Sequence, residues 1–326
     1  MVAVTPLSLT YNTAYAVDDG ESLVLVDTGP DYAGAFDSLL DRLPRLPDLV
    51  VATHAHVDHA GLGHWWQERG VPVAVGQADA PLTLAPQFRA ADEVQAMVDW
   101  VASIGAPATE VEDAAAGLWR RRDAALAQRG RDSYPQHGSN PRWPTGLRFE
   151  PFHAARTLTD GEQLPCGLTV LASPGHTPGN LVLVHRAEGW LFSGDQLLPD
   201  ITPTPAVQFR SGQWDQRFPS LPAFLASLAR LQGEDVTRCF PGHGAPFDDA
   251  QDAIALNIAQ IEQRTAKVRD ELASAGPATV YGLAERMYRR ALQRRFWQIT
   301  STLQGHLDLL EARGQARLDG TRYRAT

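Results

Sequence analysis

The stretch THAHVDHAG, residues 53–61, places three histidines and one aspartate within six consecutive positions of a 326-residue chain that has only ten histidines. These four residues are His54, His56, Asp58 and His59. On one continuous helix or strand their side chains would point in different directions. The apolar run PDLVVA comes just before them and is typical of a buried strand. We therefore expect a strand that ends near Thr53, a loop, and a helix that begins near Gly61.

Three further residues with metal-binding side chains follow apolar runs and stand beside glycine. They are His176 in SPGHTPGN, Asp195 in LFSGD and His243 in PGHG. Open α/β folds place ligands at the carboxyl ends of their strands, so we expect all seven side chains to meet at one edge. Imidazole and carboxylate groups suit zinc, iron and manganese. Because one catalytic zinc takes three protein ligands, this set predicts two divalent ions, which we expect to be Zn²⁺, with iron or manganese as alternatives.

The first 248 residues alternate strand and helix patterns, which predicts an α/β domain. Apolar runs at residues 7–17 and 21–29 flank an Asp-Asp-Gly turn and predict a hairpin. Helices are expected at residues 33–42, 92–103, 109–128 and 221–231. Two of these lie in a helical insertion of about residues 79–148. We interpret the insertion either as a lid or substrate wall, or as a helical pair that covers a sheet edge.

Residues 249–326 are expected to form a separate, mostly helical domain. Helical patterns cover residues 248–274, 281–292 and 298–313. The last of these has an apolar face made of Ile299, Leu303, Leu307 and Leu310. The closing sequence ARLDGTRYRA alternates around an Asp-Gly turn and predicts a hairpin. Helix, helix and hairpin in this order are the outline of a winged-helix module.

Composition and charge limit the class of protein. The net charge of −9 divides into +5 for residues 277–326 and −14 for the rest, so the tail either meets an anionic partner or presents a solvated helical face. No apolar run approaches the roughly 18 residues of a membrane span, so we expect no membrane partner. Two cysteines are too few for a disulfide framework, and the first twenty residues lack a signal-peptide pattern. We therefore expect a cytoplasmic protein.

Taken together, these motifs resemble those of the metallo-β-lactamase superfamily. THAHVDHAG is similar to its HxHxDH signature, and SPGHTPGN, LFSGD and PGHG resemble its later motifs in the family's order. The sequence VDTG, which contains Asp27, resembles the strand-end motif that supports the metal loop. The resemblance covers roughly residues 7–247 and implies an αββα sandwich. The tail is similar to the winged-helix domain attached to one branch, and the whole looks like a glyoxalase-II-like metallohydrolase.

The resemblance also implies roles for individual residues. His54, His56 and His176 look like ligands of a first ion, Asp58, His59 and His243 like ligands of a second ion, and Asp195 like a bridge. A hydroxide shared by the two ions would be the nucleophile. If only one ion binds, Asp58 would act as a general base on its water. Asp27 would orient a histidine or the loop backbone, or would simply form the turn in Asp-Thr-Gly.

A fold does not determine a function, so we infer the substrate class from positions where this chain differs from individual family members. Residue 195 is aspartate where some true β-lactamases have a zinc-binding cysteine. The sequence after it lacks the tyrosine common in acyl-homoserine lactonases, and GAPFDDAQ lacks the basic glutathione contacts of glyoxalase II. We therefore expect a general hydrolase of a small-molecule ester or thioester. Residues 196–214 would wall a pocket for its acyl chain.

Alternative functions stay open. Two-ion chemistry also suits phosphodiesters, so the chain would be a ribonuclease or phosphodiesterase if the basic tail holds nucleic acid. A lactonase or a β-lactamase-like amide hydrolase is a second alternative. In a third, the chain is a metal-binding scaffold without catalysis, which we expect to have lost a ligand, whereas none is missing here. If the tail does not hold nucleic acid, it would complete the substrate pocket or pair the chain into a homodimer.

Overall fold

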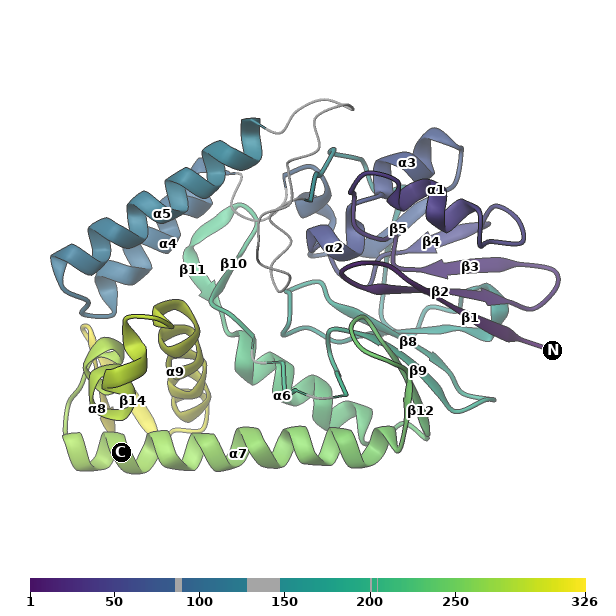
Figure 1. Cartoon of the computed structure of the whole chain (residues 1–326). Helices are drawn as coiled ribbons and strands as arrows, with labels where there is room; N and C mark the ends of the chain where they lie inside the picture. The colour runs from purple at the N-terminus through teal and green to yellow at the C-terminus, as the bar shows by residue number, and fades with distance from the viewer. Residues whose placement is uncertain (86–89, 128–146, 200, 204) are drawn as a thin grey trace.

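The computed structural model describes the whole chain except residues 86–89, 128–146, 200 and 204. Two β-sheets lie face to face in one half of the molecule (Figure 1). The first sheet has six strands in sequence order: β1 (Ala3–Ser8), β2 (Thr13–Asp18), β3 (Leu23–Val26), β4 (Leu49–Val51), β5 (Val73–Gly76) and β6 (Arg156–Leu158). The second has the order β13 (Phe247–Asp248), β12 (Arg238–Pro241), β9 (Trp190–Gly194), β8 (Leu181–His185) and β7 (Thr169–Ala172).

Successive side chains of a strand point to opposite faces of its sheet, and both faces of each sheet are covered. In β3, Val24 and Val26 pack between the sheets, where they join Phe192 of β9 in one apolar cluster. Leu23 and Leu25 belong to a different cluster on the outer face. All four residues of β3 are buried. The strand is therefore a continuous apolar run rather than an alternating one.

Helices cover the two outer faces. The first sheet carries α1 (Ala35–Leu40), α2 (Val57–Ala60) and α3 (Gly63–Glu68), and the second carries α6 (Ser220–Leu231) and α7 (Ala250–Ala275). Phe36 and Trp66 pack on the first outer face, and Phe224 and Ile254 pack on the second. Two short 3₁₀ turns, η1 (Ala80–Thr83) and η2 (Pro165–Gly167), lie in the connections. These four layers confirm the αββα sandwich expected from the sequence.

A second apolar core lies at the other end of the molecule. It is built by α4 (Ala91–Ser103), α5 (Ala108–Ala127), α8 (Val280–Leu292), α9 (Phe296–Ala312) and the hairpin of β14 (Ala316–Asp319) and β15 (Arg322–Ala325). Trp100 of α4 donates a hydrogen bond to Gln304 of α9, with 3.2 Å between the nitrogen and oxygen. A further hairpin, β10 (Gln208–Arg210) and β11 (Gln213–Phe218), lies between the two halves (Figure 1). The helical insertion therefore packs against the tail.

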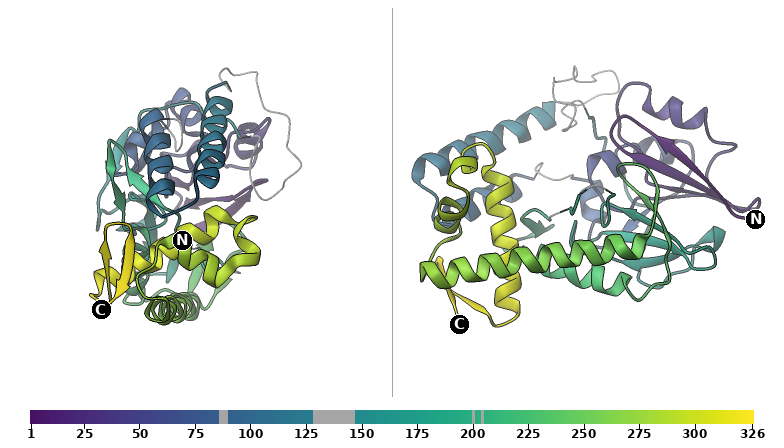
Figure 2. Two further views of the ribbon diagram at one scale, coloured as in Figure 1. Left: turned by 90° about the vertical axis from the view of Figure 1, so that its left-hand side faces the viewer. Right: turned by 60° about the horizontal axis from the view of Figure 1, so that its bottom comes forward.

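Helix α7 connects the two halves, and Figure 2 shows it running along one side of the molecule. Ile254 belongs to the core under the second sheet, whereas Leu272 belongs to the helical core. The expected helices of the insertion and tail are confirmed within a few residues, but the division into residues 1–248 and 249–326 stays a prediction. Among the described residues, no helix combines the length and apolar character needed to cross a membrane.

Candidate metal centre

The histidine cluster occupies the loop between β4 and α2, at the carboxyl end of β4. The strand ends at Val51, within two residues of the expected end near Thr53. The helix expected near Gly61 is α3, which begins at Gly63, and a short helix that was not expected, α2, precedes it from Val57. The carbonyl oxygen of His56 accepts hydrogen bonds from two amides of α2, at 3.0 and 2.8 Å. The second half of the cluster therefore lies in the first turn of α2, and the first half lies in the loop.

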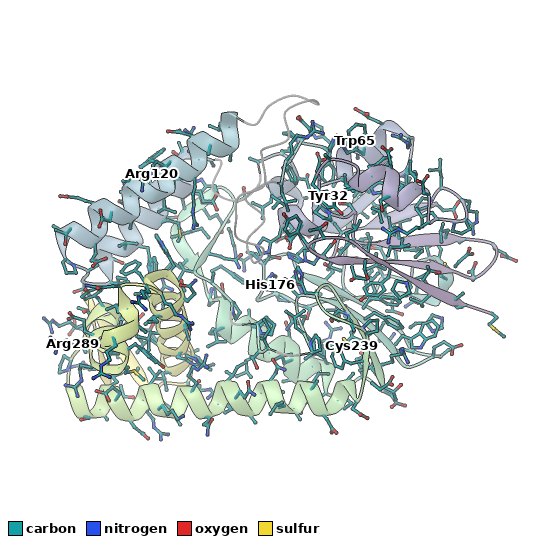
Figure 3. The ribbon with its side chains drawn as sticks, viewed as in Figure 1. Tyr32, Trp65, Arg120, His176, Cys239 and Arg289 are labelled. Carbon is teal, nitrogen blue, oxygen red and sulfur yellow. The ribbon has the colours of Figure 1, made fainter. Side chains whose placement is uncertain are left out.

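Three histidines from two loops form a first group of possible ligands. His54 Nε2 lies 3.0 Å from His56 Nδ1, and His176 Nε2 lies 3.1 Å from the same atom. The loop of His176 follows β7, in the other sheet. Figure 3 shows His176 in the middle of the molecule, where the sheets meet the helical half. The ligand atoms of these three side chains lie within 4.8 Å of one another, close enough to hold one ion.

A second group combines Asp58, His59 and His243, whose ligand atoms also lie within 4.8 Å of one another. His243 Nε2 is 3.3 Å from Asp58 Oδ2 and 3.3 Å from His59 Nε2. Asp195 lies between the two groups. Its Oδ2 is 3.3 Å from His176 Nε2 in the first group, and its Oδ1 is 3.4 Å from His243 Nε2 in the second. The structure thus brings all seven predicted ligands to one site.

The chemistry of these donors fits divalent cations. Burial lowers the pKa of His54 well below its usual value and that of His176 to about 3, so both rings are neutral and keep a lone pair for a cation. Burial also opposes protonation of His243, but Asp195 and Asp58 raise its pKa to about 10, because these carboxylates attract positive charge. Oδ1 of Asp195 is buried without a hydrogen bond of good geometry among the described residues. An ion held here would satisfy this oxygen.

Asp27 lies behind the second group, at the end of β3. Its Oδ2 is 2.7 Å from His59 Nδ1, and its Oδ1 accepts hydrogen bonds from the amide and hydroxyl of Thr53, at 2.8 and 2.9 Å. The imidazole of His59 therefore donates through Nδ1 and turns its Nε2 toward the site. The carbonyl oxygen of Tyr11 does the same for His243, through a bond of 2.6 Å to its Nδ1. These contacts match the orienting role expected for Asp27, which stays a prediction.

Asp79 joins two loops of the site, and sequence reasoning missed it. Its buried carboxylate accepts hydrogen bonds from the amide of Ala55 at 2.9 Å, from the hydroxyl of Thr177 at 2.7 Å and from the amide of Gly179 at 2.7 Å. One side chain thus ties the loop of the first two histidines to the loop of His176. No ligand motif surrounds it in the sequence, and its partners lie far away along the chain.

Glycines let the loops approach one another closely. A Cβ on Gly242 would lie 2.5 Å from His59 Cε1 and 2.8 Å from Asp195 Oδ1, so only glycine fits beside these two side chains. A Cβ on Gly179 would lie 2.3 Å from the amide nitrogen of Asp79. Gly242, next to His243, and Gly179, three residues after His176, are therefore required by packing at the site.

The remaining histidines and the cysteines lie outside this site. His185 is buried on β8, and His306 is buried on α9, where it contacts Thr265. His64 is buried on α3, 3.8 Å from Asp31. His153 is exposed, and His137 lies outside the described residues. Cys166 and Cys239 are unpaired and buried, as expected for small apolar side chains.

Comparison with known proteins gives the same family as the motifs. A model of the metallo-beta-lactamase superfamily matches residues 8–243. The chain is 27% identical to "Probable metallo-hydrolase YqjP" of Bacillus subtilis (strain 168), over 92% of this chain and 90% of that protein. It is 29% identical to "Acyl-coenzyme A thioesterase MBLAC2" of Bos taurus, over 56% of each protein. Both relatives bear the names of hydrolases.

Two solved structures share the fold over the full chain. The metallo-beta-lactamase family protein TTHA1429 from Thermus thermophilus has a TM-score of 0.69 at 23% identity, covering 100% of this chain and 98% of that one. A beta-lactamase domain protein from Burkholderia ambifaria has a TM-score of 0.70 at 22% identity, covering 100% and 91%. Because the family model spans more than half of the sequence, and the site and fold agree with it, this chain belongs to the metallo-β-lactamase superfamily of hydrolases.

Proposed function

We propose that this chain hydrolyses a small-molecule thioester or ester at a binuclear zinc site, with acyl-coenzyme A thioesters as the leading substrate class. The observation that carries the proposal is the position of Asp195, whose two oxygens face ring nitrogens of both groups of ligands. One carboxylate between two such groups suits a pair of ions rather than a single one. Iron or manganese would fit the same imidazole and carboxylate donors.

In this proposal each group of side chains has one task. His54, His56 and His176 would hold the first ion, Asp58, His59 and His243 would hold the second, and Asp195, which lies against both groups, would serve both. When bound, the ions supply an ionised water and stabilise the negative charge that develops on the carbonyl oxygen. The chain itself supplies orientation, since Asp27 and the carbonyl of Tyr11 turn two rings toward the site. With a single ion, Asp58 would instead be a general base.

The substrate class rests on the relatives. The MBLAC2 relative is named as an acyl-coenzyme A thioesterase, although this chain spans only about half of its length. The segment after Asp195 remains our proposed wall for the acyl chain. The two unpaired, buried thiols support a cytoplasmic location. We also propose that residues 249–326 form a winged-helix-like domain.

The test is a substrate panel combined with metal analysis. We expect close to two zinc ions per chain and hydrolysis of an acyl-coenzyme A. Asp195→Asn is expected to lower kcat/KM by about a hundredfold or more, because it removes one charge from both ion sites. Asp215→Asn is the matched control, since Asp215 is exposed on β11 and carries the same charge. It should leave kcat/KM unchanged.

The same panel decides among the alternatives. It includes a lactone, a β-lactam and labelled single-stranded RNA. Cleavage of RNA without turnover of any thioester or ester would contradict the proposal and support the nuclease alternative. Binding of that RNA should then weaken steeply as salt rises, because phosphate contacts release counterions. Turnover of only the lactone or the β-lactam would support the lactonase or amide-hydrolase alternative.

A further inference from the structure

The hairpin of β10 and β11 lies between the sheets and the helical half of the molecule (Figure 1). Gln208 stands opposite Phe218 in its ladder, and Phe209 stands opposite Arg217. Directly opposite residues point to the same face of a ladder, and successive residues point to opposite faces. Phe209 and Arg217 therefore share one face of the hairpin, and Gln208 and Phe218 share the other.

The first face is fixed to the helical half. Arg217 donates two hydrogen bonds to the carboxylate of Asp308 on α9, at 2.7 and 3.0 Å. The amide of Gln304, which accepts a hydrogen bond from Trp100 of the insertion, also donates to Asp308, at 2.8 Å. Phe209 packs against the apolar core of the same half. Because a bidentate arginine–carboxylate pair fixes both distance and direction, the position of the hairpin depends on that of α9.

The second face contacts the metal centre. Gln208 is 7% exposed, and its Nε2 donates a hydrogen bond to the carbonyl oxygen of His176. Within the described part of the chain, that carbonyl accepts no other hydrogen bond. His176 belongs to the first group of candidate ligands. One side chain of the hairpin therefore holds the backbone of a candidate ligand.

The residues on either side of His176 are held by the αββα half instead. Asp79 accepts hydrogen bonds from two residues that follow His176. Before it, the carbonyl oxygen of Pro174 accepts a hydrogen bond from the hydroxyl of Ser227 on α6, at 2.8 Å. The ends of the loop are thus fixed to the sandwich, whereas the carbonyl of the ligand residue itself is fixed to the hairpin. Since affinity for an ion depends on the orientation of each ligand, a shift of the hairpin would change the first group.

We propose that Gln208 is a positioning residue for His176, and that the β10–β11 hairpin couples the helical half to the metal centre. The packing of the insertion on the tail, transmitted through Asp308 and Arg217, then sets how firmly the loop of His176 is held. This role of the insertion and the tail needs no contact with a substrate. The effect on ion affinity rests on the proposed function, whereas the effect on the loop does not.

Hydrogen–deuterium exchange of the metal-free chain measures the loop directly. Gln208→Leu keeps the approximate size of the side chain but removes its donor, so we expect the amides of residues 173–180 to exchange about tenfold faster. Arg217→Gln breaks the pair with Asp308 and should accelerate the same amides. Residues 181–185 of β8 should keep their exchange rates, which distinguishes local opening from global unfolding.

Zinc affinity, measured by competition with a chelator, is the second readout. Both variants should bind zinc about tenfold more weakly, because residues that orient a ligand typically contribute this much to affinity. Gln216→Leu is the matched control for the first variant, since Gln216 is exposed on the same hairpin. Arg186→Gln is the control for the second, since it breaks another bidentate pair, with Glu234, at 3.1 Å for both bonds. Neither control should change the exchange of residues 173–180 or the zinc affinity.

The outcomes separate this inference from the proposed function. Unchanged exchange of residues 173–180 in a folded Gln208→Leu chain would overturn it, even where acyl-coenzyme A is hydrolysed. Faster exchange in Gln208→Leu but not in Arg217→Gln would overturn the coupling to the helical half. Faster exchange in both with unchanged zinc affinity would overturn the effect on the first group of ligands. Faster exchange in both, but in neither control, supports the coupling even where no thioester is turned over.

Discussion

Asp79 shows how a buried carboxylate can shape a metal site that it does not line. Burial raises its pKa, while the hydroxyl of Thr177 and the amides of Ala55 and Gly179 favour the ionised form by donating hydrogen bonds. Those donors belong to the two loops that supply the first group of histidines. Hydrogen bonds to a buried charge are worth about 1.5–3 kcal/mol each, enough to hold both loops in one arrangement.

We predict that Asp79→Asn weakens metal binding by about tenfold or more, because an amide has only one acceptor oxygen for three donors. The measurement is zinc affinity by competition with a chelator. Asp113→Asn, on the exposed surface of α5, is the control with the same chemical change. Unchanged zinc affinity in a folded Asp79→Asn protein would show that the two loops hold their positions without this carboxylate.

At the scale of elements, α5 depends strongly on its own helix propensity. Its sequence, ATEVEDAAAGLWRRRDAALA, is rich in alanine, and among residues 108–126, whose burial the structure describes, only Ala114 and Leu118 are deeply buried. Gly117 stands in the middle of the helix, where a Cβ would meet nothing within 4 Å. Glycine costs an ordinary helix position about 0.8–1 kcal/mol relative to alanine, mainly through backbone entropy. Glycine at this position therefore lowers the stability of the helix, and no close contact requires it there.

Gly117→Ala is expected to raise the free energy of unfolding by about 0.5–1 kcal/mol. Urea denaturation measures this change. Gly212→Ala serves as the opposite control, because a Cβ there also meets nothing within 4 Å but the residue has a φ of +78°. Alanine is strained in that left-handed conformation, so the control should lower the free energy of unfolding. A loss of stability in Gly117→Ala would contradict the interpretation of α5.

At the scale of the whole molecule, the packing of α9 against α7 makes stability depend on pH. His306 is 1% exposed and neutral, and burial lowers its pKa to about 4, with a further lowering by Arg264 and an opposing effect of Glu262. In the unfolded chain a histidine has a pKa of about 6.5. Between these two values the unfolded chain binds the proton and the folded chain does not, so acid favours unfolding.

The free energy of unfolding should therefore be highest above about pH 6.5 and should fall as the pH drops toward 4, by up to roughly 3 kcal/mol from His306 alone. Urea unfolding at several pH values gives this dependence. His306→Gln removes the titrating group and should flatten it, whereas His153→Gln, at an exposed position, should not. Equal pH dependence in the wild type and in His306→Gln would assign the effect to other groups.

The sequence by itself determined the fold class and the members of the candidate site. Strands buried on both faces must be continuous apolar runs, and the candidate metal ligands follow such runs beside glycine, as in SPGHTPGN and PGHG. These are local patterns, so they can be read without knowing which segments meet. Element boundaries were less predictable, because α2 begins at Val57 through a hydrogen bond to the carbonyl of His56, which composition does not reveal.

Only the tertiary structure decided what depends on contacts between distant residues. The partners of Asp79 and the packing of the insertion on the tail through Trp100 and Gln304 join segments that are separated in the sequence. A buried polar group gains its stabilising partners from whichever loops the fold brings near, and hydrophobic periodicity carries no information about that pairing. The chemistry of the candidate ligands could therefore be predicted from the sequence, whereas the contacts that position these ligands could not.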